Sequence, residues 1–182
     1  MSPMPSEPSA AQALQASPPA LAPFRLDDGA VRDEWIDHNG HMNVAFYHLA
    51  FDQAAGRFFR WLGLDQAYRS RHHASTFALE VHLNYLRELL RGERFAIEAL
   101  LLSSDAKRLH YCMQMMRAES AEVVATYESL SVHVDLRTRR SAPMPQELQG
   151  QLQAVVRAHA AHPRPWQVGR AVGAPLPAVR PS

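Results

Sequence analysis

The stretch NVAFYHLAFDQAAGRFFRWLGL, from Asn43 to Leu64, decides the fold. Asn43 is a suitable N-cap, helix formers fill the body, and Gly63 stands where a glycine commonly ends a helix. Apolar side chains go most of the way around this predicted helix, among them Phe46, Tyr47, Leu49, Phe51, Ala54, Phe58, Phe59 and Trp61. We therefore expect a long helix that is buried on nearly every side.

Alternating segments after this helix predict strands. The stretch TFALEVHLNYL is expected to carry one apolar face and one polar face. The apolar face would hold Phe77, Leu79, Val81, Leu83 and Tyr85, and the polar face Glu80, His82 and Asn84. Three further stretches follow at hairpin spacing, namely RFAIEALLLSS, KRLHYCMQMMRA and EVVATYESLSVHVDL. The simplest topology is an antiparallel meander of TFALEVHLNYL and these three strands.

The segments at either end complete the predicted domain. Residues 24–37 contain a strand, with or without a hairpin, and an amphipathic helix is expected from Gln146 to about His159. His72 and His73 are expected in a polar loop. A helix of this kind is buried when an antiparallel sheet wraps around it, so we expect that arrangement. It is the α+β hotdog fold. Part of the sheet and its edge would stay exposed in a monomer, so we expect a homodimer or a dimer of dimers.

The length and composition of the chain limit the number of domains and the kinds of partner that we expect. A chain of 182 residues suits one domain, here residues 24–160, flanked by flexible segments rich in Pro, Ala and Ser at 1–23 and 161–182. The net charge of +1 leaves no broad field for nucleic acid or an anionic membrane. No stretch reaches the roughly 18 apolar residues of a membrane span. Cys112 is the single cysteine, and no secretory signal is apparent, so we expect a cytoplasmic protein.

The heptapeptide DHNGHMN, from Asp37 to Asn43, stands directly before the predicted helix. Asp37 and Asn43 suit a turn and a helix cap, which is the ordinary role of these residue types there. The alternative is a catalytic loop. A metal site is disfavoured, because His38 and His41 lack a second well-spaced pair and an acid placed as in H-E-x-x-H.

A resemblance to a known family favours the catalytic interpretation. The pattern Asp37-x-x-Gly40-His41-x-Asn43, followed by Tyr47 and Phe51, resembles the signature of hotdog acyl-CoA thioesterases of the 4-hydroxybenzoyl-CoA thioesterase type. The segments DAKRLHY, VATYES and SVHVDLRTRRSAPMP resemble a narrower branch, the betainyl-CoA thioesterase-like enzymes of carnitine and betaine metabolism. The resemblance extends from about Trp35 to Leu152. It implies hydrolysis of a small acyl-CoA to the free acid and CoA, with CoA as part of the substrate and without a separate cofactor.

The resemblance also implies roles for the residues of the motif. Asp37 would act as nucleophile or general base, and the positive end of the helix dipole favours its charged form. A thiolate leaving group has a pKa of about 8.5, so no strong general acid is needed. Gly40 would permit a tight turn, and His41 would orient Asp37 or pack beside a partner subunit. Asn43 is expected to cap the helix, and free N–H groups from Asn43 to Phe46 would hold the carbonyl oxygen.

Several residues outside the loop are candidates for binding the substrate. Tyr47, Tyr85 or Trp61 would face a quaternary ammonium group. Glu80 and His82 would reach the cleft only across a dimer, and otherwise belong to a solvated face. Lys107 and Arg108, and further Arg87, Arg91, Arg139 and Arg140, are either partners of the CoA phosphates or surface charges. His133 belongs either to the cleft or to a buried polar pair.

Two competing functions follow from the same fold. A non-catalytic acyl-CoA-binding or sensor protein would bind CoA esters without turnover. An enoyl-CoA hydratase is disfavoured, because such enzymes use Asp and His five residues apart, whereas Asp37 and His41 are four apart.

Overall fold

The computed structural model describes residues 23–173, so residues 1–22 and 174–182 of the two predicted flexible segments lie outside the described residues. The described part contains a sheet, three α-helices and one 3-10 helix, Asp33–Trp35. The α-helices are α2 (Val44–Trp61), α3 (Gln66–His72) and α4 (Gln146–His159). The strands are β1 (Phe24–Ala30), β2 (Ala74–Tyr85), β3 (Arg94–Ser104), β4 (Arg108–Arg117), β5 (Val123–Asp135) and β6 (Arg140–Ser141).

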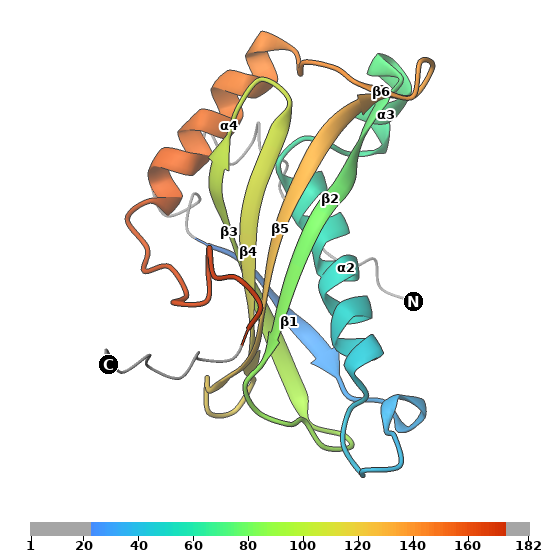
Figure 1. Ribbon diagram of the computed structural model, residues 1–182, viewed down its shortest axis with the longest axis vertical. Coiled ribbons are helices and arrows are strands. Elements are labelled where there is room, and N and C mark those ends of the chain that lie inside the picture. The colour runs from blue at the N-terminus through green and yellow to red at the C-terminus, as the bar shows by residue number, and fades with distance from the viewer. Residues whose placement is uncertain (1–22, 174–182) are drawn as a thin grey trace, which may run out of the picture.

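The sheet is antiparallel, with the strand order β1-β3-β4-β5-β2 and with β6 paired to β5. Helix α2 lies across one face of this sheet (Figure 1), which we call the inner face. The core fills the space between them and includes Phe51 and Phe58 of α2 and Tyr111 of β4. The α+β hotdog fold expected from the sequence is confirmed by this arrangement.

The ends of α2 follow from its sequence. The side chain of Asn43 accepts the N–H of Ala45 at 2.9 Å, and Gly63 adopts the left-handed φ of +88° just after the helix. The expectation that α2 is buried on nearly every side is wrong for the single chain. The sheet covers one side of the helix only, so Val44 and Leu49 remain 54% and 39% exposed.

The predicted topology is correct for three strands and wrong for the fourth. β3, β4 and β5 form the expected meander, but β2 pairs with β5, and β3 has β1 as its other neighbour. The connection from β2 to β3 is residues 86–93, which is longer than the usual hairpin loop of about 2–5 residues. This length lets the chain cross from the edge strand β2 past β5 and β4 to β3, which lies inside the sheet.

A β-bulge also changes the predicted faces of β2. The register shifts between Ala78 and Glu80, so Leu79 is the extra residue. Residues directly opposite in an antiparallel pair share a face. Val81 and Leu83 therefore lie on the inner face, opposite Ser129 and Tyr127, as expected. The prediction that Phe77 shares their face is wrong, because Phe77 lies opposite Val132, beyond the bulge.

His72 is the last residue of helix α3 and His73 directly follows the helix, whereas the sequence indicated a loop for both. Asp65 caps α3 by accepting the N–H of Tyr68 at 2.7 Å, and His73 ends the helix with a φ of +49°. The helix predicted from Gln146 to His159 is present with these bounds.

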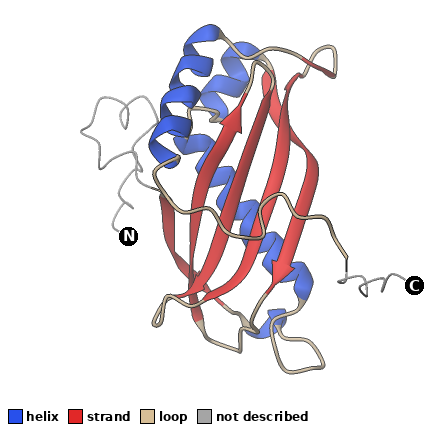
Figure 2. Ribbon diagram, turned by 60° about the vertical axis from the view of Figure 1, so that its left-hand side comes forward, coloured by secondary structure: helices blue, strands red, loops and turns tan. Residues whose placement is uncertain are grey.

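Helix α4 protects part of the sheet edge. Nδ1 of His159 accepts the N–H of Leu101 at 2.9 Å, and the side-chain amide of Gln153 donates to the carbonyl of Ser104 at 2.7 Å. These side chains bind backbone groups of β3 beyond the end of β1. The chain then crosses the outer face of the sheet, opposite α2 (Figure 2), where the N–H of Gly169 donates to Glu128 at 2.9 Å.

Candidate active site

The loop from Asp37 to Asn43 forms a tight turn before α2. The N–H of Asp37 donates to the carbonyl of His41 at 3.1 Å, and the N–H of Gly40 donates to the carbonyl of Asp37 at 3.0 Å. An isolated antiparallel bridge between Ile36 and Met42 closes the turn. Gly40 has a φ of +82°, a conformation that other residues adopt at a cost, so the turn explains the glycine.

The carboxylate of Asp37 is largely shielded from solvent and held by the backbone. Its side chain is 15% exposed, and its Oδ1 accepts the N–H of Asn39 at 2.8 Å. Nδ1 of His41 lies 3.9 Å from this oxygen, which is too long for a hydrogen bond, and 3.3 Å from the carbonyl of Met42. His41 thus stands beside Asp37 without binding it directly.

The start of α2 offers few free N–H groups for an oxyanion. Among the residues proposed from the sequence, Asn43 donates to the carbonyl of Trp35. Ala45 donates to the side chain of Asn43, and Phe46 to its carbonyl. Within residues 23–173 no acceptor is present for the N–H of Val44, which lies at the exposed first turn of the helix. The N–H of Val44 is therefore the remaining candidate among these groups for binding the oxyanion.

Of the three candidate aromatic residues, only Tyr85 has an exposed ring beside the loop. Tyr47 is 3% exposed, and its hydroxyl accepts the N–H of Leu89 at 2.9 Å. Trp61 is buried at the far end of α2. Tyr85 packs edge-on against Tyr47 with ring centroids 5.4 Å apart, stays 48% exposed, and donates its hydroxyl to the carbonyl of Val44 at 3.4 Å.

Glu80, His82 and Arg108 lie away from Asp37 in the single chain. They line a pocket of about 680 Å³ together with His110, Glu128 and Gly169. Side chains alternate along β5, so Glu128 and Leu130 lie on the outer face when Tyr127 and Ser129 lie on the inner face. Glu80 and His82 are opposite Leu130 and Glu128, so this pocket is on the outer face of the sheet. The pocket and the Asp37 loop are therefore two separate places on the protomer.

The basic candidates fall at the two ends of the sheet. Lys107 and Arg108 occupy the β3–β4 turn, where Asp105 accepts both of their N–H groups at 2.8 Å. Strand β3 rises about 3.3 Å per residue, so this turn is about 30 Å from the start of the strand near the loop. Arg87 and Arg91 lie at the loop end, where they pair with Glu122 and Asp33, each at 3.1 Å.

His133 belongs to a buried polar pair, which is one of the two alternatives that the sequence left open. It is 3% exposed, with Nε2 at 2.8 Å from the hydroxyl of Tyr68 and Nδ1 at 2.8 Å from the carbonyl of Ala142. These contacts join β5 to α3 and to the segment after β6. Residues 23–173 contain no cluster of three or more His, Cys, Asp or Glu side chains that could hold a metal ion.

The sheet, the central helix and the turn of Asp37 before it form the arrangement expected of a thioesterase with the hotdog fold. Residues 31–152 match the family described as the thioesterase-like superfamily. The chain belongs to this family, so the family resemblance and the enzyme class inferred from the motif are confirmed. In the part of the chain that the structure describes, no helix is both long and apolar enough to cross a membrane.

Individual relatives place the chain within this family. It is 40% identical over 150 residues to a betainyl-CoA thioesterase of Pseudomonas aeruginosa, with 82% of this chain and 93% of the relative covered. It is 35% identical over 154 residues to an L-carnitine dehydrogenase/betainyl-CoA thioesterase of Rhizobium meliloti, with 85% and 31% covered. A Staphylococcus aureus protein solved in complex with CoA has a TM-score of 0.78 and 29% identity, with 84% and 96% covered.

Proposed function

We propose that the protein hydrolyses a small acyl-CoA, with betainyl-CoA as the leading substrate, to the free acid and CoA. The observation that carries the proposal is the turn that holds the shielded carboxylate of Asp37 at the start of α2, close in sequence to the free N–H of Val44. The 40% identity to a betainyl-CoA thioesterase supports the choice of substrate. The reaction needs no cofactor, and we expect it to take place in the cytoplasm.

Asp37 can act in one of two ways in this reaction. As a general base it takes a proton from water while the water oxygen attacks the thioester carbon. As a nucleophile it attacks that carbon itself and forms an anhydride, which water then hydrolyses. In both cases the developing oxyanion accepts the N–H of Val44, the C–S bond breaks, and the thiolate of CoA leaves and takes up a proton.

Tyr85 is our candidate for recognition of the acyl group. A quaternary ammonium group is attracted to the face of an aromatic ring. Among the three aromatic residues considered, Tyr85 is the one with an exposed ring, and its hydroxyl binds the carbonyl of Val44. The acyl group would then lie between Tyr85 and the N-terminus of α2. Arg87 and Arg91, at the same end of the sheet, are our candidates for the CoA phosphates.

We also propose that the enzyme is a homodimer formed through β2. This strand is at the edge of the sheet, with a row of backbone groups that no strand among residues 23–173 pairs. Apolar side chains with large exposed fractions gather at this edge, namely Leu79 at 58%, Val44 at 54% and Tyr85 at 48%. Such a dimer would bring the Asp37 loop of one protomer close to the β2 strand of its partner.

The test compares the wild type with Asp37→Asn on a panel of acyl-CoA substrates, with release of CoA measured by a thiol reagent. Loss of the carboxylate should lower kcat by about 10²- to 10⁴-fold, while CoA binding measured by calorimetry is retained. Glu34→Gln is the matched control, because Glu34 is an exposed carboxylate shortly before the loop. Tight binding of CoA esters without turnover in the wild type would instead identify a sensor.

A further inference from the structure

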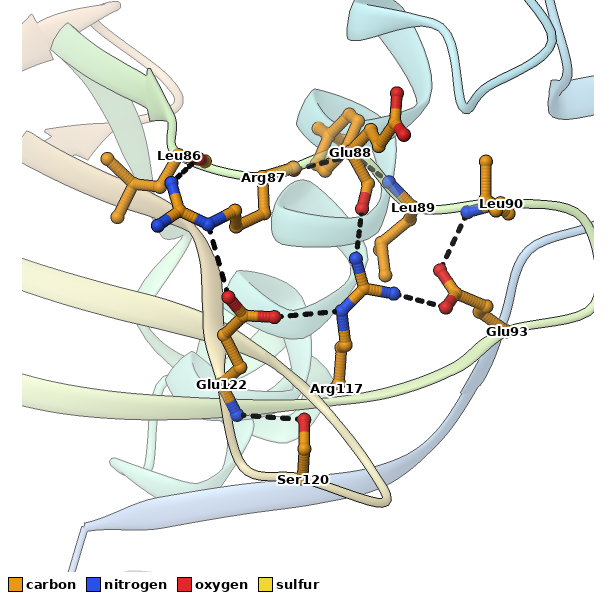
Figure 3. Close-up of polar contacts among 10 residues, drawn as sticks. Leu86, Arg87, Glu88, Leu89, Leu90, Glu93, Arg117, Ser120 and Glu122 are labelled. Atoms are coloured by element: carbon orange, nitrogen blue, oxygen red, sulfur yellow. Dashed lines mark hydrogen bonds and ion pairs between the residues drawn. The ribbon is translucent and has the colours of Figure 1, made fainter.

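We propose that Arg117 is a positioning residue that fixes the Asp37 loop through the connection between β2 and β3. Arg117 is the last residue of β4, and Figure 3 shows its guanidinium group pointing at this connection. The inference rests on the proposed function in one respect, namely that Asp37 performs the chemistry. Arg117 itself is assigned no contact with the substrate.

The guanidinium group of Arg117 binds three residues on two segments, the turn after β4 and the connection between β2 and β3. Its Nε donates to Glu122 at 3.1 Å, its Nη1 pairs with Glu93, and its Nη2 donates to the backbone carbonyl of Glu88 at 2.6 Å. The side chain is 22% exposed. Burial alone would lower the pKa of Arg117, but the hydrogen bonds to Glu122 and Glu93 outweigh it and raise this pKa. The group therefore remains charged.

The next residue of the connection binds the catalytic loop directly. Leu89 is fully buried, and its carbonyl accepts the N–H of Met42 at 2.8 Å. Met42 forms the bridge with Ile36 that closes the turn around Asp37. The position of the turn thus depends on the position of Leu89. Leu89 directly follows Glu88, whose carbonyl Arg117 binds.

Arg117 holds the middle of the connection, where regular pairing is lacking. The N–H groups of Leu86 and Arg87 both donate to the carbonyl of Val124, where the connection begins. Near its end, the Glu93 carboxylate accepts the N–H of Leu90 at 2.7 Å and also binds Arg117 (Figure 3). A single side chain therefore joins the end of β4 to both the carbonyl of Glu88 and the carboxylate of Glu93.

The geometry of a guanidinium group is needed for these contacts. Its planar fork directs several N–H groups to separate acceptors at once, whereas a lysine presents one nitrogen. Without Arg117 the carbonyl of Glu88 loses its partner, and Leu89 is held only by its buried side chain and by the bond from its N–H to Tyr47. A shift of about 1 Å in a catalytic group can cost about 100-fold in rate. The expected effect is largest on the chemical step and smaller on substrate binding, to which Arg87 and Arg91 of the same connection would contribute.

The experiment measures kcat and KM for betainyl-CoA with Arg117→Ala and Arg117→Lys. We expect kcat to fall about 10- to 100-fold in Arg117→Ala and less in Arg117→Lys, with a smaller rise in KM. Added guanidinium ion at millimolar concentration should restore part of the lost kcat in Arg117→Ala. Arg25→Ala is the matched control, because Arg25 pairs with Glu98 at 2.8 Å between β1 and β3, and we assign it no role in the site.

Hydrogen–deuterium exchange provides a readout that does not depend on activity. In Arg117→Ala, peptides that cover residues 36–43 and 86–93 should exchange faster, while the peptides of β4 and β5 keep their protection. Wild-type kcat in folded Arg117→Ala, or a uniform rise in exchange with no guanidinium rescue, would overturn the proposal. If Asp37→Asn is fully active, the proposed function fails instead, and the exchange pattern still decides whether Arg117 holds the loop.

Discussion

The hydroxyl of Tyr47 accepts the backbone N–H of Leu89 at 2.9 Å, and this bond ties the central helix to the connection between β2 and β3. The carbonyl of the same Leu89 binds Met42 of the acidic turn. Burial raises the pKa of Tyr47, so its hydroxyl stays protonated at neutral pH. The tyrosine of the motif therefore contacts the connection that binds the loop, and the substrate contact suggested by the sequence stays a prediction.

Tyr47→Phe should destabilise the protein, because it leaves the N–H of Leu89 buried without an acceptor. The expected loss is about 1–3 kcal/mol in the free energy of unfolding, or about 2–4 °C in Tm for each kcal/mol. Thermal unfolding measures this directly. Tyr85→Phe is the control, since the hydroxyl of Tyr85 is exposed and its bond to Val44 is 3.4 Å long, so its loss should be under about 0.5 kcal/mol. Equal losses in both variants would contradict the assigned role of Tyr47.

Local patterns predicted the elements well, and long-range pairing less well. The bounds of α2 follow from Asn43 and Gly63, whose capping roles depend on residue type and neighbours alone. The bulge at Leu79 carries no such signal, because an apolar residue in an alternating strand looks regular until its partner strand is known. The pairing of β2 with β5 is likewise a property of the whole sheet, which the order of strands along the chain does not determine.

In the candidate site, too, the local features were predicted and the long-range contacts were not. Asp37, Gly40 and Asn43 lie together in one turn as the motif predicted, because a short loop keeps sequence neighbours close in space. Leu89 and Arg117 were missed. Leu89 acts through backbone groups that every residue has, and Arg117 is one of many arginines in the chain, so neither has a distinctive sequence pattern.

Asp105 should make the stability of the β3–β4 turn depend on pH. The N–H of Lys107 is the main cause that lowers the pKa of Asp105, and the side chain of Arg108 adds to it. A lowered folded-state pKa stabilises the protein above the unfolded pKa of about 3.9, and this contribution is lost as the pH falls through the folded value. Asp105→Asn should thus be less stable than the wild type at pH 7, by about 0.5–1 kcal/mol after solvent screening.

The measurement for Asp105 is a series of urea unfolding curves from pH 7 down to pH 3. The difference between wild type and Asp105→Asn should shrink steadily at the acid end of this range. Other carboxylates titrate in both proteins and cancel in the difference. A gap that stays constant with pH would show that the charge of Asp105 does not contribute.

Cys112 should be inert toward thiol reagents in the folded protein. Its side chain is buried between β3 and the segment of Val168, and burial raises the pKa of its thiol to about 12. The reactive thiolate is then a very small fraction at pH 8. A disulfide reagent should label no thiol in the native protein and one per chain after unfolding, since Cys112 is the only cysteine. Rapid labelling of the native protein would contradict this burial, and would also add a background to the CoA-release assay.

The proposed dimer can be tested at Leu79, which lies at the bulge of the edge strand and is 58% exposed. Leu79→Glu should leave the protomer folded, because the side chain is exposed there. A charge in an apolar interface is costly, so the variant should shift from dimer to monomer in sedimentation equilibrium. Val172→Glu is the control, since Val172 is 93% exposed and follows Gly169 in the segment that crosses the outer face. A Leu79→Glu protein that remains as dimeric as the wild type would place the interface on another surface, and a monomeric wild type would remove the dimer altogether.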